Sequence, residues 1–301
     1  MNAVVIGGSG QIGGWLLRSL AKRGHEAVGT YCTVAYPGLV HVDGADLEGS
    51  AAWLRARRPE VVFFPAGFTW VDGCERDPAK ARGANLAQPL NLARVAAEVG
   101  SKFVYYSTDY VFDGMDGPYD ETSPTNPLSV YGLAKLDAEI ALADILGDSL
   151  LIARTSWVFG PERQGKNFAY QLVKTLRSGK RLTVPSDQIS SPSYGPDVAE
   201  ASVRLIEAGR SGVYHVAGPE VLSRPAFARV IAEMFGLDPN PIKSRTTAEL
   251  GQGAPRPLNG GLRAPRLAAE LPGVMRTLRD ALSDFRDAIS SGDGWADPQE
   301  G

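Results

Sequence analysis

The stretch from Ala3 to Gly13 reads Ala-Val-Val-Ile-Gly-Gly-Ser-Gly-Gln-Ile-Gly and decides the fold. Its four leading apolar residues are typical of a buried parallel strand. The residues from Ile12 to Lys22 then show the spacing of an amphipathic helix. A glycine-rich turn between such a strand and such a helix binds a dinucleotide pyrophosphate, because it exposes backbone N–H groups at the helix N-terminus. The residues predicted to bind the cofactor here are Gly7, Gly10, Gln11, Ile12 and Gly13.

Strand and helix patterns continue to alternate along the chain after this turn. Alternation of this kind predicts an α/β fold of the Rossmann type, with a doubly wound parallel sheet. The predicted strands cover Glu26–Thr30, 61–64, Lys102–Tyr106, Leu150–Ala153 and Gly212–Val216. The predicted helices cover Ala51–Arg57, Pro78–Val99 with Pro89 at a break or a new first turn, Val130–Leu146 and Asp197–Ala208.

The chain is long enough for a second, smaller domain. Strand signals fade after about residue 218, where segments rich in proline, arginine and glycine begin. We predict a dinucleotide-binding domain over residues 1–160, to which residues 195–218 return. Residues 161–194 and 219–301 then form a smaller, discontinuous α/β lobe that binds the substrate.

Composition excludes several classes of function. The formal net charge is −3, so nothing predicts a nucleic-acid or membrane partner. Cys32 and Cys74 are the two cysteines; they are far apart in sequence, and no His or Cys cluster has metal-ligand spacing. We expect no metal, no disulfide, no signal peptide and no transmembrane helix, and therefore a cytoplasmic protein.

Tyr131 and Lys135 form a Y-x-x-x-K pair within a predicted helix. Residues four apart share one helix face, so the phenol and the ammonium point the same way. Thr108 follows a strand, at the edge of the sheet where ligands bind in open α/β folds. Tyr131 is therefore the expected proton donor, Lys135 the group that lowers its pKa or holds a ribose, and Thr108 a donor to a substrate carbonyl.

The choice between nicotinamide cofactors depends on the second strand. It ends Val-Gly-Thr-Tyr-Cys at positions 28–32, with no acidic residue to bind ribose hydroxyls and no nearby arginine. The missing carboxylate favours NADP(H) over NAD(H). Asp46 and Leu47 follow a third short strand and either border the adenine or lie in a solvated loop.

Several further segments have a recognisable pattern: residues 66–72 (AGFTWVD), 107–114 (STDYVFDG), 127–132 (PLSVYG) with Lys135, 154–160 (RTSWVFG), 166–168 (KNF), 214–218 (YHVAG) and 256–259 (RPLN). In this order and spacing, they resemble the dTDP-4-dehydrorhamnose reductase family of extended short-chain dehydrogenases. The resemblance implies that Thr108, Tyr131 and Lys135 are catalytic, that Ala66 and Gly67 line the cofactor, and that the substrate contacts are Thr108, Asp109, Tyr110, Trp157, Asn167 and Arg256. Each of the last four also has a structural alternative: Tyr110 as a packing residue, Trp157 as a core residue, Asn167 as a helix N-cap and Arg256 as a solvated loop residue.

The resemblance implies reduction of the 4-keto group of a nucleoside-diphosphate 6-deoxysugar, in a protein that can form a homodimer. The related 4,6-dehydratases carry an acidic pair after the active-site Thr, whereas Asp109 is followed here by Tyr110. Dehydration needs both an acid and a base, so the residues favour simple reduction. Two alternatives stay open: an epimerase or dehydratase, and a non-catalytic NADP-binding subunit like the beta subunit of methionine adenosyltransferase.

Overall fold

The computed structural model describes residues 1–291, and a parallel sheet of seven strands forms its centre. The strand order is β11-β6-β5-β4-β1-β2-β3. The bounds are β1 (Asn2–Val5), β2 (Glu26–Tyr31), β3 (Val40–His41), β4 (Val61–Phe64), β5 (Lys102–Thr108), β6 (Leu150–Thr155) and β11 (Gly212–His215). The chain reverses its winding direction between β1 and β4, and the carboxyl ends of these strands border the crevice where ligands bind in such folds. The predicted fold is confirmed.

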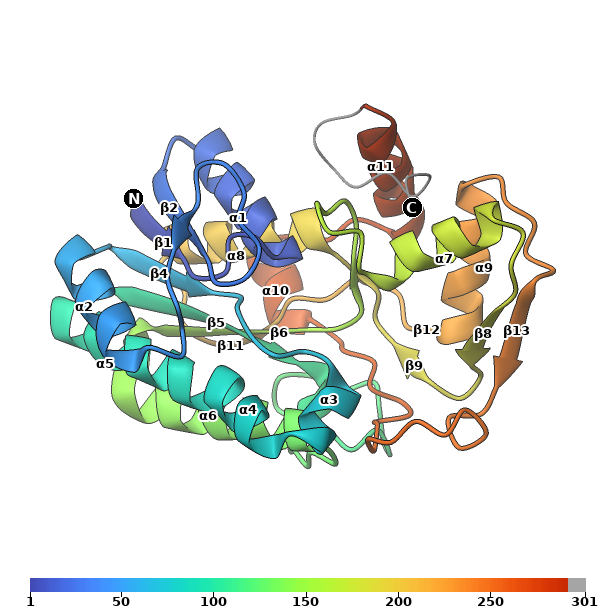
Figure 1. The fold of residues 1–301 in the computed structure, drawn as a ribbon, viewed down its shortest axis with the longest axis horizontal. Coiled ribbons are helices and arrows are strands. Elements are labelled where there is room, and N and C mark those ends of the chain that lie inside the picture. The colour runs from blue at the N-terminus through green and yellow to red at the C-terminus, as the bar shows by residue number, and fades with distance from the viewer. Residues whose placement is uncertain (292–301) are drawn as a thin grey trace.

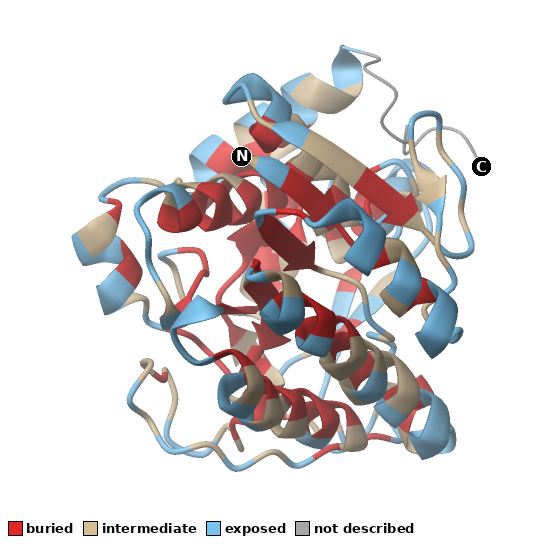
Figure 2. Cartoon of the chain, turned by 90° about the vertical axis from the view of Figure 1, so that its left-hand side faces the viewer, coloured by how far each residue is buried: buried red, intermediate tan, exposed pale blue. Residues whose placement is uncertain are grey.

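Helices cover both faces of this sheet (Figure 1). The helices α1 (Gln11–Lys22) and α8 (Gly195–Glu207) pack on one face, and α2 (Leu47–Arg57), α5 (Gln88–Val99) and α6 (Val130–Leu146) on the other. The buried colour in Figure 2 follows the strands and the inward faces of these helices. Burial of this apolar surface contributes about 25 cal/mol per Å² and provides the main stabilisation of the sheet.

The helical region predicted from residue 78 to residue 99 contains a local widening. It consists of α4 (Pro78–Arg82), a π-helical segment (Gly83–Ala87) and α5. Pro89 lies in the first turn of α5, which was one of the two positions predicted for it. The widened turn presents Asn85, whose amide donates to the carbonyl of Phe68 and accepts from its N–H at 2.9 and 3.0 Å. This fixes the segment after β4, where α3 (Val71–Arg76) begins, a helix that periodicity did not reveal.

A second group of elements lies beside the carboxyl ends of the strands (Figure 1). It contains α7 (Phe168–Arg177), α9 (Arg224–Met234) and α11 (Leu278–Ser290), which share an apolar cluster that includes Phe227 and Phe285. β8 (Leu182–Pro185) pairs with β13 (Ile242–Arg245), β9 (Ile189–Ser190) with β12 (Leu222–Ser223), and β7 (Val158–Phe159) with β10 (Ser193–Tyr194). α10 (Pro265–Glu270) instead packs on the main sheet through Leu267. The assigned domain limits remain a prediction, and residues 292–301 of the predicted lobe lie outside the described residues.

Candidate active site

The glycine turn after β1 is shaped for close approach of a ligand. Gly7 has φ +93°, a conformation that L side chains rarely adopt, and its carbonyl accepts from the N–H of Gly10 at 3.0 Å. A Cβ on Gly13 would overlap the Gly7 carbonyl oxygen. Gly10 caps α1 without any side-chain hydrogen bond to its first amides. Those N–H groups are therefore available to an anion at the positive end of the helix.

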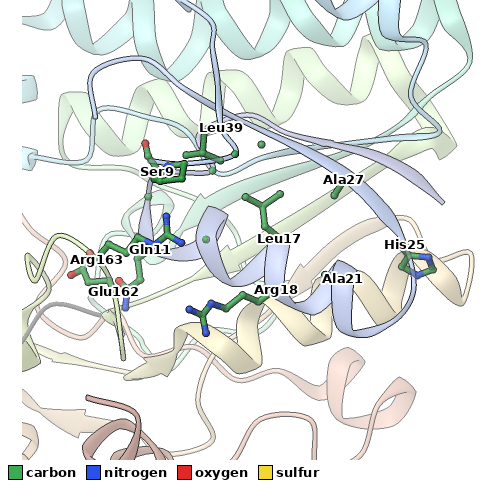
Figure 3. Close-up of a pocket in the computed structure, with 16 residues that line it drawn as sticks. Ser9, Gln11, Leu17, Arg18, Ala21, His25, Ala27, Leu39, Glu162 and Arg163 are labelled. Atoms are coloured by element: carbon green, nitrogen blue, oxygen red, sulfur yellow. The ribbon is translucent and has the colours of Figure 1, made fainter. Parts of the chain in front are cut away.

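A cleft extends from this turn between α1, β2 and the loop after β2 (Figure 3). Ser9 and Gln11 line the end of the cleft nearest the turn, and Arg163 comes there from the segment after β7. The Arg163 guanidinium lies 4.7 Å from the centre of the Tyr36 ring. Gln164 donates to the backbone carbonyl of Ser9 at 2.9 Å, which fixes this segment on the glycine turn. Sequence analysis found no arginine near the end of β2, because Arg163 is distant from that strand in sequence.

The other residues predicted to bind the cofactor lie in two places. Asp46 is the N-cap of α2, where its carboxylate accepts from the N–H of Gly49 at 2.9 Å, and Leu47 is exposed beside it. Ala66 packs against the glycine turn: a Cβ on Gly7 would lie 3.0 Å from that of Ala66. A Cβ on Gly67 would lie 3.9 Å from the Lys135 Nζ. The strand end after β4 therefore joins the glycine turn to the Y-x-x-x-K helix.

Tyr131 lies in the first turn of α6, which begins at the N-cap Ser129. Its side chain is 7% exposed and makes an edge-to-face contact with Tyr110 at a ring separation of 5.6 Å. Burial raises the pKa of Tyr131, and hydrogen bonding with the Thr108 hydroxyl opposes that shift. The phenol is therefore protonated at neutral pH, as a proton donor must be.

Lys135 lies one turn further along α6 and is 3% exposed. Its ammonium donates to the carbonyl of Tyr106 at 2.7 Å and lies 4.3 Å from the centre of the Tyr105 ring. Burial lowers the pKa of Lys135 to about 7, although the nearby Glu139 carboxylate opposes this shift. The Lys135 ammonium thus lies beside the strand end at Gly67.

Because the Lys135 ammonium is buried, it should lower the free energy of unfolding by an amount that depends on pH. Burial lowers the pKa of Lys135 from its ordinary value of 10.5 to about 7 in the folded chain, so between these values the unfolded state holds the additional proton. Stability therefore rises with pH in this window, by up to about 1.4 kcal/mol per pH unit. Lys135→Met removes the titrating group. The variant should therefore have a higher free energy of unfolding than the wild-type chain at pH 7, and this difference should shrink by pH 9, as measured in urea titrations. A difference independent of pH would contradict the buried charge.

Thr108 is the last residue of β5, and Asp109 follows it directly. The Thr108 hydroxyl donates to Asp109 Oδ1 at 3.0 Å, while Ser156 and Ser190 both donate to Asp109 Oδ2 at 2.9 Å. Burial raises the pKa of Asp109, and these hydroxyl donors oppose that shift. Since its oxygens are occupied in this way, Asp109 orients Thr108 and ties β5 to the segments after β6 and at β9.

The remaining predicted substrate residues are held by partners within the chain. Asn167 is the N-cap of α7, with its amide carbonyl accepting from Ala169 and its amide nitrogen donating to Glu162 at 2.9 Å. Arg256 pairs with Asp72 of α3 at 2.8 Å and lies near Tyr110, where it opposes the rise in the pKa of Tyr110 that burial causes. The alternative prediction of an N-cap therefore describes Asn167, and Arg256 is not a solvated loop residue.

Trp157 packs against the apolar cluster of the second group of elements. Its ring is stacked beside that of Phe227 at a ring separation of 6.1 Å. Its φ of +40° is strained for a residue other than glycine, at a cost of order 1–3 kcal/mol. The guanidinium of Arg224 lies 3.4 Å from the centre of its ring. Sequence analysis did not single out Arg224, because an arginine after Ser223 carries no motif.

Neither a metal cluster nor a membrane span is found within residues 1–291. No group of three or more His, Cys, Asp or Glu side chains in this range could hold a metal ion. No helix of the described chain is long and apolar enough to cross a membrane.

Comparisons with known proteins agree on one family. Residues 1–291 match the family model described as the RmlD substrate binding domain. The chain is 35% identical to a probable low-salt glycan biosynthesis reductase of Haloferax volcanii, over 96% of this chain and 99% of the relative. It is 33% identical to the dTDP-4-dehydrorhamnose reductase of Mycobacterium tuberculosis, over 93% and 90%.

Solved structures give the same result. A dTDP-4-dehydrorhamnose reductase of Bacillus anthracis in complex with NADP superposes with a TM-score of 0.86 at 27% identity, covering 95% of this chain and 99% of that one. A dTDP-glucose 4,6-dehydratase of Streptomyces venezuelae superposes with a TM-score of 0.83 over the full length of both chains, but at 21% identity. The second likeness shows the fold alone.

Proposed function

Since the chain belongs to the RmlD substrate binding domain family, we propose that it is an NAD(P)H-dependent reductase of a nucleoside-diphosphate 4-keto-6-deoxysugar. One observation carries the proposal: Thr108, Tyr131 and Lys135 converge at the strand ends beside Gly67, next to the glycine turn. A proton donor and a dinucleotide cradle at one sheet edge are what reduction of a carbonyl group requires.

The cradle fits a nicotinamide dinucleotide. The free amides at the start of α1 suit a pyrophosphate, and the glycine at position 13 leaves room that any Cβ would fill. Gly7, Gly10, Gln11, Ile12 and Gly13 would hold the pyrophosphate, Ala66 and Gly67 would line the nicotinamide half, and Asp46 and Leu47 would border the adenine. When bound, this group supplies the hydride for the reduction.

The protein residues supply position and the proton. The Thr108 hydroxyl oxygen accepts from the N–H of Tyr110 at 3.2 Å, and its proton turns from the present acceptor, Asp109 Oδ1, to the keto oxygen when the substrate binds. Tyr131 gives its phenolic proton to the same oxygen as negative charge develops there, and its buried, protonated state suits this role. Lys135 holds the ribose hydroxyls and stabilises the resulting phenolate.

The alternative functions are less well supported. A dehydratase needs a second acid beside Asp109, whereas Tyr110 occupies that position and packs edge-to-face on Tyr131. Relatives that match most of this chain are named as reductases, which favours an enzyme over a regulatory subunit. We propose that the substrate lies between the carboxyl ends of the strands and the predicted lobe, of which residues 161–194 and 219–291 are described.

NADP(H) is the proposed cofactor, and Arg163 supports that choice. Arg163 lies beside Ser9 in the cleft at the glycine turn, where a 2′-phosphate would meet a guanidinium without an opposing ribose-binding acid. Arg163→Gln should weaken NADPH binding about tenfold, since a hydrogen bond to a charged group contributes about 1.5–3 kcal/mol. NADH binding, measured by the same fluorescence titration, serves as the control and should not change. Equal loss for both cofactors would contradict a 2′-phosphate site.

The proposed function is tested by NADPH oxidation at 340 nm with dTDP-4-dehydrorhamnose prepared enzymatically. We expect turnover with this keto sugar and none with dTDP-glucose, which has no keto group to reduce. Absence of NADPH oxidation across dTDP-, UDP- and GDP-linked keto sugars would overturn the proposal. Conversion of the sugar without net NADPH consumption would indicate an epimerase or dehydratase instead.

A further inference from the structure

Arg224 is the first residue of α9, and its guanidinium is held flat on aromatic rings. It lies 3.4 Å from the centre of the Trp157 ring and 4.7 Å from that of Phe168, and the side chain is half-buried. Stacking of this kind fixes the plane of the guanidinium while leaving its N–H groups free at the edge.

The Arg224 guanidinium has no hydrogen-bond acceptor within residues 1–291. Three other arginines with reduced exposure are each paired: Arg154 with Glu139 at 2.6 Å, Arg256 with Asp72 at 2.8 Å and Arg276 with Asp197 at 2.6 Å. Asp109 and Tyr110 act on Arg224 only through space, and the Asp109 oxygens already accept from Thr108, Ser156 and Ser190. A partly desolvated cation without an acceptor is costly unless a ligand provides one.

The surroundings hold Arg224 in this place. Trp157 carries its indole on a backbone with φ +40°, and Phe227 stacks behind it. Strained backbone of this kind persists where the neighbouring structure determines it, and it is concentrated at ligand sites. Burial lowers the pKa of Arg224 to about 10, so the side chain is still charged at neutral pH.

Two of the residues predicted to contact the substrate, Asn167 and Arg256, are already engaged. Asn167 uses its amide to cap α7 and to contact Glu162, and Arg256 is paired with Asp72. Arg224 lies close enough to Tyr110 for their charges to interact, and Tyr110 contacts Tyr131. Arg224 is therefore a cation near the proposed reaction centre whose guanidinium is open to an anion, as far as residues 1–291 show.

We propose that Arg224, presented on the face of Trp157, is the residue that binds the diphosphate of the nucleotide sugar. The inference rests on the proposed function for its substrate class. A planar guanidinium can donate two parallel hydrogen bonds to phosphate oxygens, which suits a diphosphate better than an ammonium would. Arg224 then acts in binding and leaves the proton transfer to Tyr131.

The test measures binding of dTDP by calorimetry, in the presence of saturating NADP⁺, to the wild-type chain, Arg224→Gln and Arg224→Met. We expect the variants to bind dTDP about 10–100-fold more weakly, as loss of hydrogen bonds to a charged group implies. Thymidine, which lacks phosphate, should show no such loss. With the keto sugar, KM should rise by a similar factor while kcat changes little.

Arg229→Gln is the matched control, since Arg229 lies on the same helix and is exposed. It should bind dTDP as the wild-type chain does. The methionine variant keeps the apolar stem on Trp157, so it reports on the charge if the glutamine variant fails to fold. Wild-type affinity for dTDP in a folded variant would overturn the role of Arg224 and leave the reductase proposal intact. A wild-type chain that binds neither dTDP nor UDP would overturn the substrate class itself.

Discussion

Tyr131→Phe is expected to lower kcat about 10²–10⁴-fold, the range that a positioned proton donor contributes. The substitution removes the phenolic hydroxyl and keeps the ring, so the edge-to-face contact with Tyr110 and the buried surface remain. Affinity for NADPH should stay within a few-fold, because the glycine turn and Lys135 are unchanged. Initial rates of NADPH oxidation and a fluorescence titration measure the two effects separately.

Tyr214→Phe controls for removal of a buried tyrosine hydroxyl elsewhere. Tyr214 lies in β11 at the edge of the sheet, is buried, and stacks against Arg266 rather than against the site. Its variant should keep kcat near the wild-type value. If Tyr131→Phe turns over as fast as Tyr214→Phe, Tyr131 is not the proton donor.

Gly13→Ala is expected to abolish measurable NADPH binding and to destabilise the chain by about 1–3 kcal/mol, the usual cost of forcing extra volume into a packed site. A Cβ at this position overlaps the carbonyl oxygen of Gly7, which is backbone and cannot rotate away. The turn must open, and the amides at the start of α1 then no longer converge on a pyrophosphate. Thermal unfolding and an NADPH titration of the same preparation report both effects.

Gly14→Ala is the matched control, one residue further along α1. A Cβ there would lie 3.7 Å from the Gly8 carbonyl oxygen, an ordinary contact distance. Because alanine is the better helix former, this variant should gain about 0.5–1 kcal/mol and retain NADPH binding. Equal NADPH affinity in Gly13→Ala and the wild-type chain would show that the turn does not bind the cofactor.

The features that could be predicted from the sequence are those encoded locally. The glycine turn and α1 depend on neighbouring residues, and α6 brings Tyr131 and Lys135 to one face because they are four residues apart. The short strands of the second group could not be predicted in the same way. β8 and β13 are stabilised by pairing between Leu182 and Ile242, which are distant in the chain, and four residues are too few for a periodic signal.

The same distinction separates the site residues that were predicted from those that were not. Asn167 and Arg256 have the residue types that bind phosphate, but their partners Glu162 and Asp72 become visible only in three dimensions. Arg163 and Arg224 are the converse case. Neither belongs to a motif, and each was identified from its neighbours in the fold. Arg163 lies beside the glycine turn, and Arg224 lies on the indole of Trp157.

Transfer of deuterium from NADPH that carries deuterium at both C4 positions of the nicotinamide tests the central claim most directly. With dTDP-4-dehydrorhamnose as substrate, the wild-type chain should yield a product sugar carrying one deuterium at C4, detected by mass spectrometry and NMR. Tyr131→Phe should form that product at a rate reduced about as much as its kcat. A wild-type product without deuterium at C4 would contradict direct reduction at this site.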